Sequence, residues 1–310
     1  MIDFRYHLVS LMAVLVALTM GVVLGAGPLQ GKISDTLSGQ VTALSKQQSE
    51  LRSTNEELVK QANNSNEYIG ILGNKVTPGT MTGKKVAVVR MPGVTDEALN
   101  GINAQLKKAG AAISNSVTLK DSWFNEDSKS YRDNLASTLA GKLGDKVDAK
   151  VSTQKVLATA LAEGLTSDDK EKQALVSNLS AGDTPLITAA AVTEPVQLIL
   201  LASPATNDKE TKNSDLKLDL DLVEGVNAVL PKGMVIVGSA KNEDEYLAQI
   251  RAKKLAVTTV DTIGSVMSNV SAPFALLADE SGSNQAYGTQ NYATQLIPPI
   301  PSPAAPAEGQ

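Results

Sequence analysis

Apolar residues fill the start of the chain without interruption. No residue from Leu8 to Ala26 is charged, and a helix over this run is about 28 Å long at a rise of ~1.5 Å per residue. That length matches the ~30 Å hydrocarbon core of a bilayer. A cleaved signal peptide is the alternative, and it normally has a shorter apolar region that ends in a small-x-small site. Because Leu24 occupies the cleavage position before Ala26, we expect a retained transmembrane helix over residues 8–26.

A heptad pattern follows the apolar run. Leucines and other apolar residues recur at the a and d positions of about five heptads, which predicts a coiled coil over residues 34–73. One amphipathic helix packed on its own domain is the alternative, and such a helix normally has a wider apolar stripe. Asn55 lies at an a position, where it can pair with its copy across a two-fold axis. Since two chains anchored in one membrane run parallel, the pattern predicts a parallel homodimer.

Small residues in the membrane helix favour the same association. Ala17, Gly21 and Gly25 recur at every fourth position, so one helix face is nearly bare and a second helix can approach it closely. The residues predicted to form the dimer contact are Gly21, Gly25, Leu37, Val41, Leu44, Gln48, Leu51, Asn55, Leu58, Ala62, Ile69 and Leu72.

Strand and helix patterns alternate after the turn at residues 77–79. Lys84–Met91 predicts a buried strand, Thr95 the cap of a helix that reaches Lys108, and Ala112–Leu119 the next strand. This alternation predicts a Rossmann-like α/β domain over residues 84–280 with a mostly parallel sheet of about five strands. Further helices are expected over 131–140, 153–163, 168–179, 219–230, 243–253 and 272–278, further strands over 195–201, 233–240 and 255–260, and a disordered Pro/Ala-rich tail over 298–310.

The turns that follow the strands lack phosphate-binding motifs. The first strand leads into residues 91–95 (MPGVT), which contain neither GxGxxG nor a Walker motif. After the strand at 233–240, Asn242 is the expected helix cap, and residues 243–245 (EDE) are expected in the first helical turn. Carboxylates there stabilise the helix dipole and repel phosphate. We therefore expect no nucleotide site.

Composition and charge narrow the chemistry further. A net charge of −5 over 310 residues gives no basic patch for nucleic acid. The lack of cysteine removes disulfides, thiol nucleophiles and Cys-based metal sites. The one histidine, His7, lies at the membrane edge, which excludes a Ser-His-Asp triad and a multi-histidine metal site from the globular part. We expect no enzyme and assign no catalytic, cofactor-binding or metal-binding residue; an enzyme that uses a phosphate or metal supplied by its substrate is the alternative.

Three stretches of the sequence carry a family resemblance. The opening MIDFRYHLVSLMAVLVALTMGVVLGAGPL, the segment KKVAVVRMPG and the later TVDTIGSVMS resemble the actinobacterial family named after mycobacterial copper transport protein B (MctB). The resemblance runs from Met1 to about Ala278 and is greatest to the SteB-type members. It implies a membrane-anchored envelope protein of copper transport or copper tolerance. The SteB-type members are linked instead to cell separation, in which they control peptidoglycan hydrolases together with a partner on the cytoplasmic side.

The residues themselves do not favour direct copper conduction. Copper sites use Cys, Met or His, and this chain has no cysteine, one histidine and seven methionines without a Met-x-x-Met cluster. One helix per subunit also cannot enclose a pore. We therefore expect a homodimeric, single-pass, non-catalytic membrane protein that binds a peptidoglycan hydrolase or another envelope or division protein. Residues 1–7 would be cytoplasmic because Arg5 precedes the span, and the main domain extracytoplasmic. Copper transport or homeostasis is the alternative, with copper implied only by the resemblance.

Overall fold

The chain forms two compact units, one up to Ser65 and one from Asn66 onward. The computed structural model describes residues 4–26, 28–144, 151–204 and 216–301. The first unit consists of helix α1 (Phe4–Ala26) and most of helix α2 (Pro28–Val76). Within the described part of the chain, the segment Phe4–Gly25 is the one helix long and apolar enough to cross a membrane. The predicted membrane helix is therefore present as a helix. Of the predicted cytoplasmic segment 1–7, residues 1–3 lie outside the described part.

Helix α2 covers the predicted coiled-coil segment without a break. It ends at Val76, directly before the turn expected from Pro78 and Gly79, and the amide of Thr77 still donates to the carbonyl of Gly73 at 2.9 Å. The i,i+4 pair Arg52–Glu56 lies on its exposed surface with 3.6 Å between the charged atoms. The helix is thus observed, and its pairing with a second copy stays a prediction.

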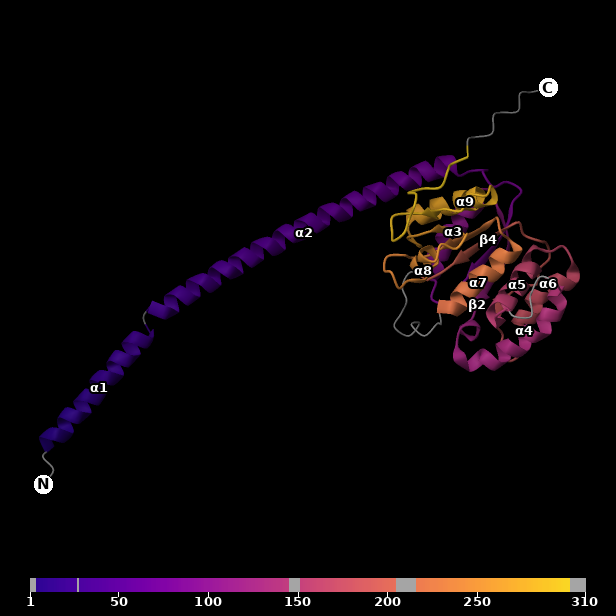
Figure 1. Ribbon diagram of the computed structural model, residues 1–310. Coiled ribbons are helices and arrows are strands. Elements are labelled where there is room, and N and C mark those ends of the chain that lie inside the picture. Colours follow the sequence, from indigo (N-terminus) through magenta and orange to yellow (C-terminus); the bar gives the residue numbers. More distant parts are fainter. Residues whose placement is uncertain (1–3, 27, 145–150, 205–215, 302–310) are drawn as a thin grey trace. The chain divides into compact units, whose positions relative to one another are not determined.

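The second unit is built on a seven-stranded sheet (Figure 1). The strand order is β3-β2-β1-β4-β5-β6-β7, and neighbouring strands are parallel except β3, which runs antiparallel to β2. The mostly parallel sheet is confirmed, but two short edge strands were missed because two or three residues cannot show a periodicity. The strands are β1 (Lys85–Arg90), β2 (Ala112–Leu119), β3 (Ile187–Ala189), β4 (Leu198–Ala202), β5 (Met234–Val237), β6 (Thr258–Val260) and β7 (Ala286–Tyr287).

Helices cover both faces of this sheet. Figure 1 shows α3 beside α9 on one side and α4 to α7 on the other. The hydroxyl of Thr95 accepts from the amide of Ala98 at 3.3 Å, so the predicted cap of α3 is confirmed. The helices are α3 (Asp96–Lys108), α4 (Lys129–Leu143), α5 (Thr153–Thr166), α6 (Lys170–Ser180), α7 (Leu216–Val229), α8 (Tyr246–Ala252) and α9 (Val266–Glu280), with short 3-10 turns at Asp121–Trp123 and Glu126–Ser128.

Two late helices differ from their predicted bounds. Helix α9 begins at Val266, six residues before the predicted start at 272, because Ser265 caps it. Pro273 lies inside this helix, whereas the prediction put it in the first turn, where proline is tolerated. Helix α8 begins at Tyr246, so Asn242 is not its cap and residues 243–245 precede it instead of forming its first turn. Of the predicted tail 298–310, residues 302–310 lie outside the described part.

The end of α2 lies inside the second unit and packs against α9. A β-carbon placed on Gly73 would lie 2.5 Å from Cγ2 of Val270, and one on Gly70 would lie 3.7 Å from Cγ1 of Val266. Ile69 is half-buried at the same helix end. Glycine therefore allows the last turns of α2 to approach the domain closely, and this contact is made by the TVDTIGSVMS stretch and the residues just after it.

Candidate functional site at the carboxyl edge of the sheet

The carboxyl ends of the parallel strands meet at one edge of the sheet. In open α/β sheets ligands bind outside this edge, in the crevice where the strand order reverses. Here that crevice lies between β1 and β4. The amide of Met91, just after β1, donates to the carbonyl of Ala202 at the end of β4, with 2.9 Å between the atoms. The two strand ends are thus tied together at the place where a nucleotide would ordinarily enter.

The turn after β1 is packed closely against the segment after β4. Gly93 has φ of +82°, and a β-carbon on it would lie 3.2 Å from Cβ of Pro204. The guanidinium of Arg90 donates to the carbonyl of Val94 and pairs with Asp96 at 2.5 Å. The side chains of Pro204 and Arg90 therefore pack against the turn that holds phosphate in nucleotide-binding proteins with a Rossmann fold.

A surface hollow lies beside this turn, at the ends of β1 and β2. Its volume is about 700 Å³. Three exposed charged side chains of both signs line it, Lys120, Asp121 and Asp183, so it has no strong preference for a cation or an anion. The remaining lining is Arg90, Met91, Pro92, Gly93, Thr118, Leu119, Ser122, Thr184 and Pro185.

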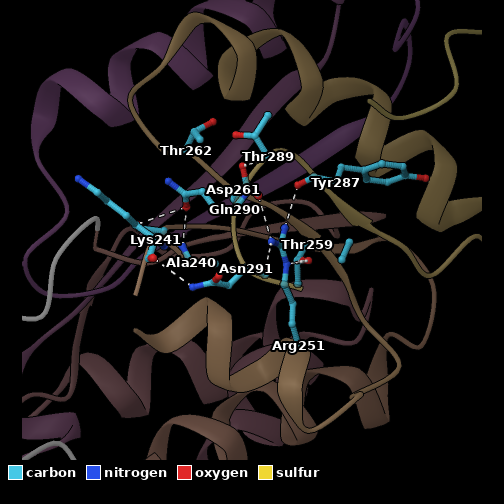
Figure 2. Close-up of polar contacts among 12 residues, drawn as sticks. Ala240, Lys241, Arg251, Thr259, Asp261, Thr262, Tyr287, Thr289, Gln290 and Asn291 are labelled. Atoms are coloured by element: carbon cyan, nitrogen blue, oxygen red, sulfur yellow. Dashed lines mark hydrogen bonds and ion pairs between the residues drawn. The ribbon is translucent and has the colours of Figure 1, made fainter. Parts of the chain in front are cut away.

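The other half of the edge, at the ends of β5, β6 and β7, is filled by a buried ion pair (Figure 2). Arg251 of α8 and Asp261 after β6 are 3.0 Å apart, and their side chains are 2% and 0% exposed. Nε of Arg251 also donates to the hydroxyl of Thr259 at 2.9 Å. The outer guanidinium nitrogens donate to the carbonyls of Tyr287 at 2.8 Å and Asn291 at 3.0 Å. All three guanidinium nitrogens of Arg251 therefore donate hydrogen bonds.

The carboxylate of the pair is equally well satisfied. Asp261 accepts from the amides of Thr289 at 3.1 Å and Gln290 at 2.9 Å. A β-carbon on Gly288 would overlap this carboxylate, so the chain can pass here only as glycine. Burial lowers the pKa of Arg251, while the hydrogen bond and charge of Asp261 raise it. Because arginine is not deprotonated in proteins, the guanidinium remains charged, and the pair acts as a fixed structural clamp on residues 287–291.

A second buried carboxylate, Glu245, lies beside this clamp. It accepts from the hydroxyl of Ser239 and the amide of Lys241, both at 2.7 Å, and from the side chain of Asn242 at 3.1 Å. The predicted first helical turn is wrong here because this carboxylate folds back onto the strand end. The carboxylate of Glu245 thus takes up the hydrogen-bond donors of the turn after β5.

The predicted dimer residues belong to helices α1 and α2 and not to the elements that form this edge. On α1 and on α2 before Ser65 they are all exposed, with nothing within 4 Å of a β-carbon on Gly21 or Gly25. Near the domain the pattern changes, since Ile69 is half-buried and Leu72 is 42% exposed. The remaining positions, described as exposed, are Leu37, Val41, Leu44, Gln48, Leu51, Asn55, Leu58 and Ala62.

The described part of the chain holds no cluster of three or more metal-ligating His, Cys, Asp or Glu side chains. Three methionines, Met81, Met91 and Met234, are buried in the core at 5% exposure or less, whereas Met12 and Met20 are exposed on α1. These three thioethers therefore serve packing, whereas Met267 of α9 is half-buried.

Sequence reasoning missed the Arg251–Asp261 pair. One signal was present, because Asp261 directly follows a buried strand inside the quoted stretch TVDTIGSVMS. Its partner is not readable from the sequence, since Arg251 resembles any basic residue in the last turn of a helix.

Comparison with known proteins gives one consistent result. The family model described as "Copper transport outer membrane protein, MctB" matches residues 1–298. A protein named "Copper transporter MctB" from Mycobacterium bovis is 25% identical over 154 residues, and proteins of that name from two strains of Mycobacterium tuberculosis match equally. The aligned region is 50% of this chain and 49% of each relative, so the chain spans about half the length of the curated relatives it matches.

Proposed function

The chain belongs to the MctB family, and from this premise we propose that it is a membrane-anchored envelope protein that serves copper handling by binding other proteins. The names of the relatives support the process, since they are called copper transporters. The burial of three of the domain's four methionines, Met81, Met91 and Met234, supports the mechanism. A protein that conducts Cu(I) must present soft ligands along a path, and these thioethers face the core.

The proposed arrangement in the membrane follows from α1. This helix would span the bilayer once, with Arg5 on the cytoplasmic side and the α/β domain outside. One spanning helix per subunit encloses no pore, so the chain would act as a mount for its domain and not as a channel. The close packing of Pro204 against the turn after β1, which has no phosphate-binding motif, supports a non-catalytic role for that domain, and we propose that it works without cofactor, nucleic acid or resident metal.

The proposed oligomer is a parallel homodimer joined through α2. The supporting observation is the exposure of the a and d positions: Leu44 is 64% and Leu51 is 63% exposed in the single chain. Such a seam is stable in water when a second copy covers it. Because α9 packs against α2 at Gly73, we propose that the dimer contact extends from Leu37 to Ala62. The end of α2 then packs on the domain of its own chain.

An experiment on copper tolerance separates partner binding from direct transport. A deletion strain should become copper-sensitive, and both the natural chain and a triple variant, His7→Ala with Met12→Leu and Met20→Leu, should restore tolerance equally. Leucine replaces methionine with little change in volume, so the anchor is kept while the soft ligands described on α1 are removed. Failure of the triple variant at equal abundance would show that the chain itself coordinates copper, which contradicts the proposal.

Cell separation is the second candidate process. It is favoured by the resemblance to SteB-type members and uses the same architecture, a strut that carries a binding domain to a peptidoglycan hydrolase and joins a membrane partner. Deletion should then produce chained cells at ordinary copper levels. Normal separation together with copper sensitivity would exclude this candidate and leave the first.

A further inference from the structure

The segment from Leu296 to Pro301 exposes an unusual amount of apolar surface for a folded domain. Leu296, Ile297 and Ile300 are 61%, 52% and 48% exposed. Pro298 between them is buried, so the segment is seated on the domain and does not hang free. We call residues 296–301 the carboxyl-terminal strip.

The prolines determine the conformation of the strip. Each of Pro298, Pro299 and Pro301 has its φ locked near −65°, and the residue before each proline is restricted to the extended or polyproline II region. A polyproline II helix has three residues per turn. The chain bends at Leu296 and Ile297, so this geometry applies to the proline-containing part of the strip, where Ile297 at its start and Ile300 share one edge.

The fold holds the start of the strip firmly. Gln295, the residue before it, forms a parallel bridge to Tyr287 of β7, and its carbonyl accepts from the amide of Gly288 at 2.9 Å. Those residues are in turn fixed by the Arg251–Asp261 clamp described above. The most buried ion pair of the described chain thus positions the segment that leads directly into an exposed apolar strip.

Charge narrows what can cover this surface. No residue between Glu280 and Glu308 is charged. A complementary surface therefore needs no charge either, and its binding should be insensitive to salt. Edge-strand pairing is an unsuitable mode, because three prolines remove the amide donors that a β ladder requires.

We propose that the carboxyl-terminal strip is a docking ligand, which inserts Ile297 and Ile300 into an uncharged, aromatic-lined groove of another envelope protein. Preformed polyproline II segments are recognised in this way because little conformational entropy is lost on binding. This inference rests on the proposed partner-binding function and names the surface that carries it.

Photo-crosslinking in intact cells tests the proposal. A benzophenone amino acid replaces Ile300 in the full-length chain, and a matched variant carries it at Lys253, which is exposed but outside the strip. We expect an adduct with a different polypeptide from position 300 only, joined through a peptide that contains Trp, Tyr or Phe. It should persist in 0.5 M salt and fall at least ten-fold when Ile297→Asp is added, an exposed change that leaves the unfolding temperature unaltered.

Several outcomes would overturn the assignment. An adduct between two copies of this chain, an adduct with lipid alone, or equal labelling from Lys253 and Ile300 each contradicts a protein groove as the occupant. Loss of the adduct at high salt would contradict an uncharged groove. A third crosslinking position, Asp183 in the hollow, keeps the two proposals separate: a protein adduct there without one at Ile300 leaves partner binding standing and removes the strip from it.

Discussion

Apolar residues are exposed on the helices of the first unit and buried in the α/β domain. Every described side chain of α1, and of α2 from Leu37 to Ser65, is exposed, whereas the domain buries every residue of its strands β4, β5 and β6. The domain therefore folds on its own contacts. In the proposed function, lipid covers α1 and a second copy of the chain covers α2. Equivalent substitutions in the two regions should have different effects.

The largest difference is expected for arginines. Arg251→Met removes the buried partner of Asp261 and should cost about 3–5 kcal/mol of unfolding free energy, because a buried charge is left unpaired. Arg52→Met removes the exposed partner of Glu56 and should change stability by less than ~1 kcal/mol. Chemical denaturation of the full chain in detergent measures both. Equal costs would mean that the Arg251 clamp is not the buried, fully bonded pair described here.

Replacing glycine by alanine should stabilise the exposed helix and destabilise the domain. Gly39→Ala, where a β-carbon meets nothing within 4 Å, should stabilise α2 by about 1 kcal/mol. Gly73→Ala places a methyl group 2.5 Å from Val270 and should destabilise the domain by about 1–3 kcal/mol. The control is Gly73→Ala combined with Val270→Ala, which should recover part of the loss. Stabilisation by both single changes would place the end of α2 away from α9.

Replacing Asn55 in the proposed dimer contact of α2 should change the stability and size of the oligomer. Asn55→Val should raise the melting temperature of the oligomer and broaden its size distribution, since a buried Asn specifies a two-stranded register at a cost in stability of about 1 kcal/mol. Ser53→Val, at a position outside the seam, should leave the oligomer unchanged. Sedimentation measures both. A clean monomer before and after the Asn55 change would contradict the homodimer.

The smallest effect should be the pH dependence of the domain. Burial raises the pKa of Asp279, although hydrogen bonds from Thr258 and the amides of Gly233 and Met234 lower it in part. The folded chain then holds this proton more tightly than the unfolded chain does. The contribution is therefore complete below the ordinary aspartate pKa of ~3.9 and is lost as the pH rises through the raised value. Asp279→Asn should flatten this dependence relative to the exposed Asp183→Asn in a denaturation series, and an unchanged slope would contradict it.

Sequence patterns predicted most of what is repeated along the chain and little of what is brought together by folding. The strand at 84–91 and the Thr95 cap were readable because burial and capping are local. Edge strand β3 was not, since a three-residue strand depends on its neighbour β2 for definition. For the carboxyl edge of the sheet, the sequence predicted only that phosphate-binding motifs are missing from its turns. Arg251 and Asp261 belong to different elements, and their pairing depends on tertiary packing that no local pattern encodes.

The clamp around Arg251 also has a consequence for biogenesis. A chain that emerges from its amino terminus completes β6 and Asp261 well before residues 287–291, which donate to and accept from the pair. Until that last segment arrives, a guanidinium and a carboxylate lack most of their partners. Premature termination before residue 287 should therefore yield a domain that proteases remove, so that completion of translation acts as a checkpoint on the folding of this domain.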